Sequence, residues 1–173
     1  SLSTVAGEYD LILKGIIDFN TPLGGNSGKA IHLTAVRDIA DLSIYGIGVA
    51  NNGSGTDGVE YIFPQIPANA GDQILVARYL NEFSQYVDTS QYWDISLDSS
   101  TTGAISMNGN DAIELFINVG TDENGNVLFE GDVIEIFGDV NVNPDTDGAG
   151  CGNDPDCWDY EDAWAYKNNM GEW

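Results

Sequence analysis

Basic residues are scarce in this sequence. Lysine and arginine together number five among 173 residues, against 28 aspartates and glutamates, so the formal net charge is −23. Direct binding to a nucleic-acid backbone needs clustered Lys and Arg side chains that neutralise phosphates, and five scattered residues form no such patch. The excess of carboxylates favours a strongly solvated surface, divalent-cation binding, or both.

Long apolar runs, histidine and cysteine are scarce as well. No stretch approaches the roughly 20 apolar residues of a transmembrane helix, so we expect no membrane span. The first ten residues lack the features of a signal peptide, so we expect a targeting segment to be absent or already removed. One histidine and two cysteines are too few for a structural zinc site, which needs four such ligands.

The two cysteines, Cys151 and Cys157, enclose five residues in a loop rich in Gly, Asp, Asn and Pro. We expect a disulfide between them rather than free thiols, and closing this short loop would contribute about 2 kcal/mol. Disulfides are typical of oxidising compartments, which predicts a secreted or cell-surface protein.

The pattern of apolar residues is typical of an all-β fold. Short alternating or continuous apolar runs recur between clusters of Gly, Asn, Asp and Pro. We predict strands over 9–18, 29–36, 42–50, 60–64, 72–79, 103–107, 112–119, 126–131, 132–140 and 163–168. Asn-Gly pairs in 108–111 and 123–126 predict hairpin turns, and 80–101 fits either a short helix or a long loop. We expect a β-sandwich formed by one domain, residues 1–173.

Residues that resemble catalytic motifs lack the partners that those motifs need. The stretch GGNSGKA (24–30) resembles a phosphate-binding loop, but Ala30 stands where a Ser or Thr would bind magnesium. Ser27 resembles a nucleophile, yet the only histidine, His32, falls on a predicted strand. We interpret 24–30 as a flexible connection between strands and His32 as a surface or packing residue. Carboxylates are too common here for their proximity to indicate a hydrolase, so we expect a protein that is not an enzyme.

Oxygen-bearing side chains alternate through residues 139–148, DVNVNPDTDG. Calcium takes six to eight oxygen ligands, and alternating Asp and Asn followed by Gly can wrap around one ion. Counted from Asn143, the order approximates an EF-hand loop, although Asn replaces the first Asp, Asp replaces the last Glu, and flanking helices are lacking. The predicted calcium ligands are Asp139, Asn141, Asn143, Asp145, Asp147 and Asp154. The alternative is a solvated acidic loop, which repulsion between its carboxylates disfavours.

Aromatic residues offer candidate stacking surfaces for a ligand. Trp158, Tyr160 and Trp164 follow the acidic loop, and Trp93 lies in the undecided segment. Aromatic residues at this spacing are also typical of a packed core, so both interpretations stay open. We name Trp158, Tyr160 and Trp164 as the candidate ligand-binding residues.

Four stretches share turns, strand alternation and core positions with one known family. They are GKAIHLTAVRDIADLSIYGIGVANNG (28–53), SMNGNDAIELFIN (106–118), GDVIEIFGDV (131–140) and DAWAYK (162–167). Together they resemble the lamin-tail domain, an immunoglobulin-like β-sandwich, in the versions found in secreted bacterial proteins beside extracellular nucleases and other hydrolases. The resemblance spans most of the chain, but its motifs are structural, so it bears on the fold more than on function.

The sequence departs from this family in three places. His32 stands where the family usually has Glu, the hairpin at 120–128 is longer, and the acidic stretch 141–162 is an insertion before the last strand. The resemblance implies a binding or tethering module, with nucleic acid, protein or membrane as partner.

We therefore expect a non-catalytic secreted accessory or adhesion module, stabilised by calcium and joined to neighbouring domains of a larger extracellular protein. Its partner would be a protein or a polysaccharide, because the charge disfavours nucleic acid unless calcium bridges to phosphate. The alternative is a substrate-binding module, for polysaccharide or nucleic acid, of an extracellular hydrolase or nuclease.

Overall fold

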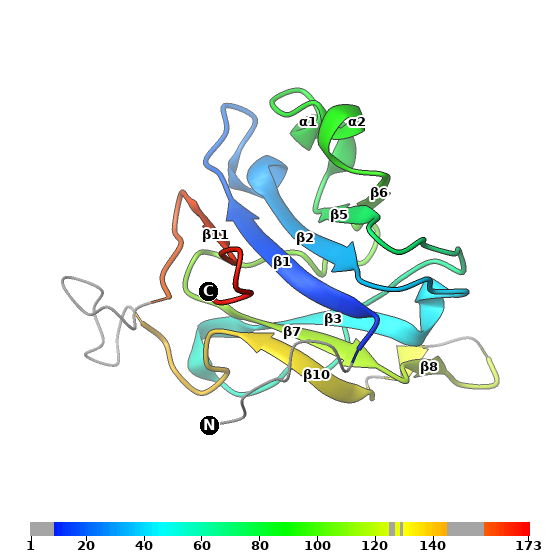
Figure 1. The fold of residues 1–173 in the computed structure, drawn as a ribbon. Coiled ribbons are helices and arrows are strands. Elements are labelled where there is room, and N and C mark those ends of the chain that lie inside the picture. The colour runs from blue at the N-terminus through cyan, green and yellow to red at the C-terminus, as the bar shows by residue number, and fades with distance from the viewer. Residues whose placement is uncertain (1–8, 125–126, 129, 145–157) are drawn as a thin grey trace.

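Two β-sheets form the framework of the protein (Figure 1). The computed structural model describes residues 9–124, 127–128, 130–144 and 158–173. The first sheet has the order β11-β1-β2-β5-β6, and its strands are β1 (Leu11–Asp18), β2 (Lys29–Ala35), β5 (Gln73–Ala77), β6 (Ile95–Asp98) and β11 (Trp164–Tyr166). The second has the order β10-β7-β3-β4, with β3 (Tyr45–Ala50), β4 (Tyr61–Ile62), β7 (Ala112–Ile117) and β10 (Asp132–Phe137). The predicted all-β architecture is confirmed.

Shorter elements connect these strands. A small hairpin pairs β8 (Gly120–Thr121) with β9 (Val127–Leu128), as the Asn-Gly pair at 124–125 predicts. Two single-turn helices, α1 (Leu80–Phe83) and α2 (Thr89–Tyr92), lie together beyond β5 and β6 (Figure 1). The 3₁₀ turns are η1 (Gly25–Gly28), η2 (Leu42–Ile44) and η3 (Asn51–Gly53).

The core lies between the two sheets and follows from strand alternation. In β2, Ile31 and Leu33 are fully buried in it, while the intervening His32 lies on the opposite face. In β1 the alternation is interrupted, because the register passes from Leu13–Leu33 directly to Gly15–His32 and leaves Lys14 as an extra residue. After this β-bulge, the side chains of β1 lie on the opposite face from the one that simple alternation from Leu13 predicts.

Glu135 connects the two sheets at one edge. It lies on β10, yet its carboxylate accepts a hydrogen bond from the Leu13 N–H of β1 at 2.8 Å and another from the Lys167 ammonium. The Glu135 and Lys167 side chains are each only 10% exposed. A buried carboxylate is costly without partners. The contacts of Glu135 with Leu13 and Lys167 therefore fix the position of β10 against the first sheet.

The sequence predictions for residues 103–107 and 108–111 were wrong. Residues 103–107 form no strand, although Ala104, Ile105 and Met107 are buried in the core as irregular backbone. Residues 108–111 therefore make no hairpin; the Asp111 carboxylate instead accepts the Asn108 and Asn52 N–H groups at 2.9 and 2.8 Å. The undecided segment 80–101 contains α1, α2 and also β6, a strand that pairs parallel to β5.

Candidate functional site

The outer face of the five-stranded sheet carries two rows of side chains that run across the strands. Pairing between neighbouring strands aligns Trp164, Ile17, Ala30 and Ala77 in the first row and Tyr166, Gly15, His32 and Leu75 in the second. Alternation places both rows opposite the core residues, such as Ile16 and Ile31. The small residues in the middle of each row leave space above the sheet.

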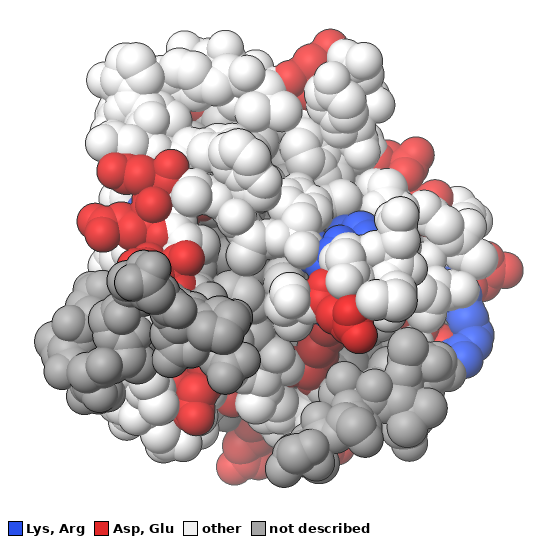
Figure 2. All heavy atoms as spheres, turned by 60° about the vertical axis from the view of Figure 1, so that its left-hand side comes forward, with Lys and Arg blue, Asp and Glu red and all other residues white. Residues whose placement is uncertain are grey.

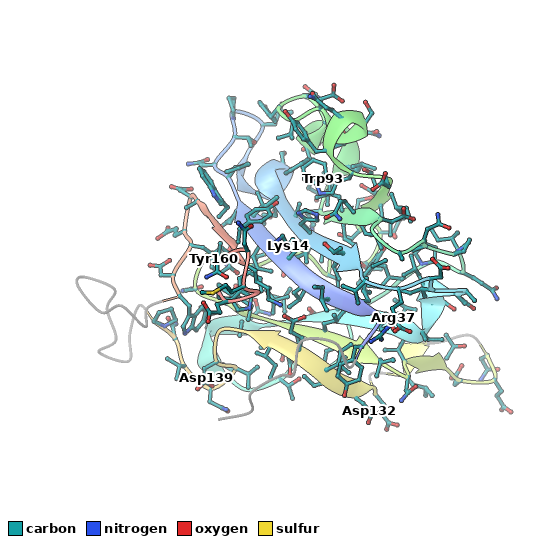
Figure 3. All side chains as sticks on the ribbon, in the orientation of Figure 1. Lys14, Arg37, Trp93, Asp132, Asp139 and Tyr160 are labelled. Carbon is teal, nitrogen blue, oxygen red and sulfur yellow. The ribbon has the colours of Figure 1, made fainter. Side chains whose placement is uncertain are left out.

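The segment that contains α1 and α2 covers part of this face. Four apolar residues of the segment pack against Ile17, Leu75 and the two alanines of the first row. They are Leu80, Phe83, Val87 and Trp93. Carboxylates fix the segment: Asp98 accepts the Leu80 N–H at 2.8 Å, and Asp88 caps α2 by accepting the Ser90 N–H at 3.1 Å. Phe83 and Trp93 are therefore held over the sheet, and Figure 3 shows Trp93 beside it.

An apolar pocket of about 220 Å³ lies between this segment and β11. We call it the aromatic pocket, and its lining residues are Ile17, Phe19, Phe83, Val87, Trp93, Trp164 and Tyr166. Trp164 is 61% exposed although it is the largest kind of apolar side chain. Its ring meets Phe19 in an edge-to-face contact, with 5.5 Å between ring centroids. Trp164 therefore presents an aromatic surface to solvent and does not seal the core.

Gly15 allows Tyr166 to lie flat across the sheet. A Cβ atom at Gly15 would be 2.4 Å from Cε1 and Cζ of Tyr166, so only glycine leaves room for this ring. The Tyr166 hydroxyl reaches His32 Nδ1 at 3.2 Å, and His32 Nε2 is 2.8 Å from Gln73 Oε1. Gln73 Oε1 is an acceptor, so Nε2 carries the proton and Nδ1 accepts from the tyrosine.

His32 and Tyr166 are both neutral at neutral pH. Burial lowers the pKa of His32, the hydrogen bond to Gln73 opposes this, and the positive charge of Lys14 lowers it further. Burial also raises the pKa of Tyr166 to about 12. The residues that line the aromatic pocket include no Asp, Glu, Lys or Arg. The pocket therefore suits an uncharged ligand with apolar faces.

The candidate aromatic residues divide between this pocket and the core. Trp164 and Trp93 both line the pocket. Tyr160 is 2% exposed and its hydroxyl donates to the Asp111 carbonyl at 2.9 Å, so its ring has no free face for a ligand. Trp158 is half-buried and packs against Phe137, with 6.0 Å between ring centroids. Figure 3 shows Tyr160 well apart from Trp93.

The predicted calcium loop falls largely outside the described residues. Asp145, Asp147 and Asp154 lie there, as do Cys151 and Cys157 of the predicted disulfide. Of the remaining candidates, Asp139 is exposed and accepts the Asn141 N–H at 2.9 Å, while Asn143 is half-buried. Within the described residues, no group of three or more His, Cys, Asp or Glu side chains could hold a metal ion. Asp139 lies far from Trp93 (Figure 3), so a calcium site there would be separate from the aromatic pocket.

Comparison of the chain with protein-family models, curated proteins and solved structures gives no match. Among the described residues, no helix is long and apolar enough to cross a membrane.

Sequence reasoning named Trp93 and Trp164 but none of the other residues that line the pocket, and it interpreted His32 as a surface or packing residue. The alternation Trp164-Ala165-Tyr166 is the signal that could have placed Tyr166 beside Trp164, because side chains two apart in a strand share a face. The alternation of His32 with Ile31 and Leu33 indicates only that His32 lies on the opposite face from them. The position of Phe19 depends on the bulge at Lys14, which no local pattern marks.

Proposed function

We propose that this chain is a non-catalytic, polysaccharide-binding module of a larger extracellular protein, and that the aromatic pocket is its ligand-binding site. The observation that carries the proposal is the exposed Trp164 ring beside Phe19, at the mouth of a pocket lined almost wholly by apolar and aromatic side chains. Sugars present apolar C–H faces that pack on such rings, and their hydroxyls remain hydrated.

The chemistry around the pocket supports binding rather than catalysis. A glycosidase needs two carboxylates on either side of the scissile bond, and no carboxylate lines the aromatic pocket. The hydroxyl of Ser27 donates to Glu82, and both ring nitrogens of His32 contact Gln73 and Tyr166. Ser27 is buried and its hydroxyl contacts Glu82 rather than His32, so the contacts of the described residues give no Ser–His pair.

The proposal also includes the fold family, calcium binding, the disulfide and secretion. The two-sheet architecture supports an immunoglobulin-like sandwich of the lamin-tail type, to which the acidic insertion 141–162 would be an addition. In this proposal the insertion binds calcium, a disulfide joins its cysteines, and the module is secreted with its neighbouring domains. The acidic surface disfavours nucleic acid as the ligand, because the chain has only five Lys and Arg residues and three of them are paired with Asp or Glu.

Affinity electrophoresis through gels that contain neutral polysaccharides tests the proposal. We expect one or more of a panel of β-glucan, galactomannan, xylan and glycogen to retard the protein. Trp164→Ala should abolish the retardation, whereas Trp173→Ala, a second partly exposed tryptophan outside the pocket, should retain it. Equal retardation of both variants, or none of the wild type on any polymer, would contradict the proposal.

A further inference from the structure

Two polar hollows adjoin the aromatic pocket. One, of about 360 Å³, is lined by residues 84–90. The other, of about 330 Å³, is lined by Asn20, Thr21, Pro22 and Asp162 together with Phe19, Tyr86 and Val87. Val87 lines both hollows and the aromatic pocket, and Tyr86 lines the two hollows. The three spaces therefore adjoin one another around Val87, and we call them together the Val87 groove.

The hollows differ from the aromatic pocket in chemistry. Hydroxyl and amide groups from Thr21, Asn20, Gln85 and the serines at 84 and 90 line them, and these groups both donate and accept hydrogen bonds. Tyr86, which is 44% exposed, adds an aromatic face to both hollows. A flexible chain of sugars offers the matching pattern, since each unit carries apolar faces and a rim of hydroxyls.

Charge restricts the ligand further. Each polar hollow contains one carboxylate, Asp88 or Asp162, and no Lys or Arg lines any of the three spaces. Figure 2 shows acidic side chains at the left, centre, right and lower edge of this face, with fewer at the top and few basic side chains. An acidic ligand would meet two carboxylates and no compensating cation, in a protein with a net charge of −23.

We propose that the ligand is an uncharged polysaccharide and that it occupies the Val87 groove with several consecutive sugar units. One unit lies in the aromatic pocket against Trp164, and its neighbours lie in the polar hollows against Tyr86. This inference rests on the proposed function and adds two properties to it, namely a dependence of affinity on chain length and the rejection of acidic polysaccharides.

Three variants separate these properties. Tyr86→Ala changes only the polar hollows, because Tyr86 does not line the aromatic pocket. Asp88→Asn and Asp162→Asn remove the two carboxylates with little structural cost. Asparagine caps a helix as well as aspartate does, and it tolerates the positive φ of 54° at residue 162.

Titration calorimetry with the neutral polymer that binds best, its oligosaccharides of one to four units and its carboxymethyl derivative tests the inference. We expect affinity to rise about tenfold or more from one to three units, a gain of about 1.4 kcal/mol that Tyr86→Ala removes. The carboxymethyl polymer should bind at least about tenfold more weakly, with a smaller difference at high salt or in the double Asp→Asn variant.

The outcomes distinguish the inference from the proposed function. An affinity that is independent of length, or equal affinities for the neutral and carboxymethyl polymers, would overturn the inference even if Trp164→Ala abolishes binding. Salt-sensitive binding of a cationic amino-sugar polymer that does not depend on Trp164 would also overturn it. No binding of the wild-type protein to any neutral polymer would overturn the proposed function itself.

Discussion

The Trp164 ring stands edge-on to the Phe19 ring, with an angle of 76° between their planes, at the edge of a sheet whose core lies on the other side. Trp164 belongs to β11, which pairs only with β1 in the described part of the chain. The contact with Phe19 thus holds a large, exposed ring in one orientation without burying it. A ring placed in this way contributes more to a ligand surface than to the stability of the fold.

Replacement of Trp164 should therefore cost little stability. We expect Trp164→Ala to change the free energy of unfolding by less than about 1 kcal/mol, since most of the side chain is already in water. The buried Tyr160 is the contrasting case, and Tyr160→Ala should cost about 3 kcal/mol or more. Urea denaturation of the two variants measures both values, and a larger loss for Trp164→Ala would show that this ring is a core residue.

Gly15 should matter for binding through Tyr166. A Cβ atom at residue 15 would overlap the Tyr166 ring, so Gly15→Ala is expected to displace the ring and weaken polysaccharide binding about tenfold or more. Gly25→Ala is a suitable control, because a Cβ atom there has no heavy atom within 4 Å and the backbone φ is not positive. Unchanged affinity in a folded Gly15→Ala protein would remove Tyr166 from the site.

Lys167 and Glu135 should show strong energetic coupling. Lys167→Met leaves a buried carboxylate without its cation and is expected to cost about 3 kcal/mol, whereas the double variant with Glu135→Gln should recover much of this loss. Arg37 and Asp10 form an exposed pair, 2.5 Å apart, whose side chains are 52% and 42% exposed. Arg37→Met should thus cost about 0.5 kcal/mol or less. Additive effects of Lys167→Met and Glu135→Gln would show that the pair does not connect the sheets.

Glu114 should contribute more to the stability of the protein at acid pH than at neutral pH. Burial raises the pKa of this carboxyl above its ordinary value of 4.5, the hydroxyl of Thr56 lowers it by donating a hydrogen bond, and Asp57 raises it again. The folded state thus holds the proton more tightly than the unfolded state does. The contribution of Glu114 is fully present below pH 4.5 and is lost as pH rises through the raised pKa.

Glu114→Gln tests this direction of the pH dependence. The variant stays neutral, so it should unfold at a higher temperature than the wild type at pH 7, and the difference should shrink as pH falls toward 4. Glu130→Gln removes the same charge from an exposed position and should show a smaller, salt-dependent effect. A Glu114→Gln protein that loses stability at pH 7 would show that the ionised carboxylate is favourable.

Calcium should stabilise the protein if the acidic insertion binds it. We expect the Tm to rise when calcium is added and to fall with a chelator, and Asp145→Asn with Asp147→Asn should remove the difference. Magnesium at the same concentration controls for general screening of the charge. A Tm that is the same in calcium and in chelator would exclude the metal part of the proposal.

The main strands were predictable because their burial follows a simple period. Ile31 and Leu33 alternate with the half-buried polar residues His32 and Thr34, and the apolar run of β7 reflects burial on both faces. β6 was missed because its residues are only half-buried and its partner β5 runs parallel to it. Residues 103–107 have the apolar pattern of a strand but reach the core as a loop.

The site was only partly predictable for a related reason. Trp164 was recognised as a candidate together with Trp158 and Tyr160, since residues close in sequence look alike before their burial is known. Tyr160 precedes β11 and enters the core, whereas Trp164 is the first residue of β11 and lies on the outer face of the sheet opposite Ile17. The pairing that brings Trp164 to Phe19, across about 145 residues of sequence, depends on tertiary contacts that no local pattern specifies.

The side-chain N–H signals of the four tryptophans give the most direct test of the aromatic pocket. Trp93 and Trp164 line the pocket, whereas Trp158 and Trp173 pack against Phe137, away from it. In ¹H–¹⁵N spectra, titration with an oligosaccharide of the bound polymer should shift the indole signals of Trp93 and Trp164 and leave the other two in place. Shifts confined to Trp158 or Trp173, or no shift of Trp164 at saturation, would contradict binding in this pocket.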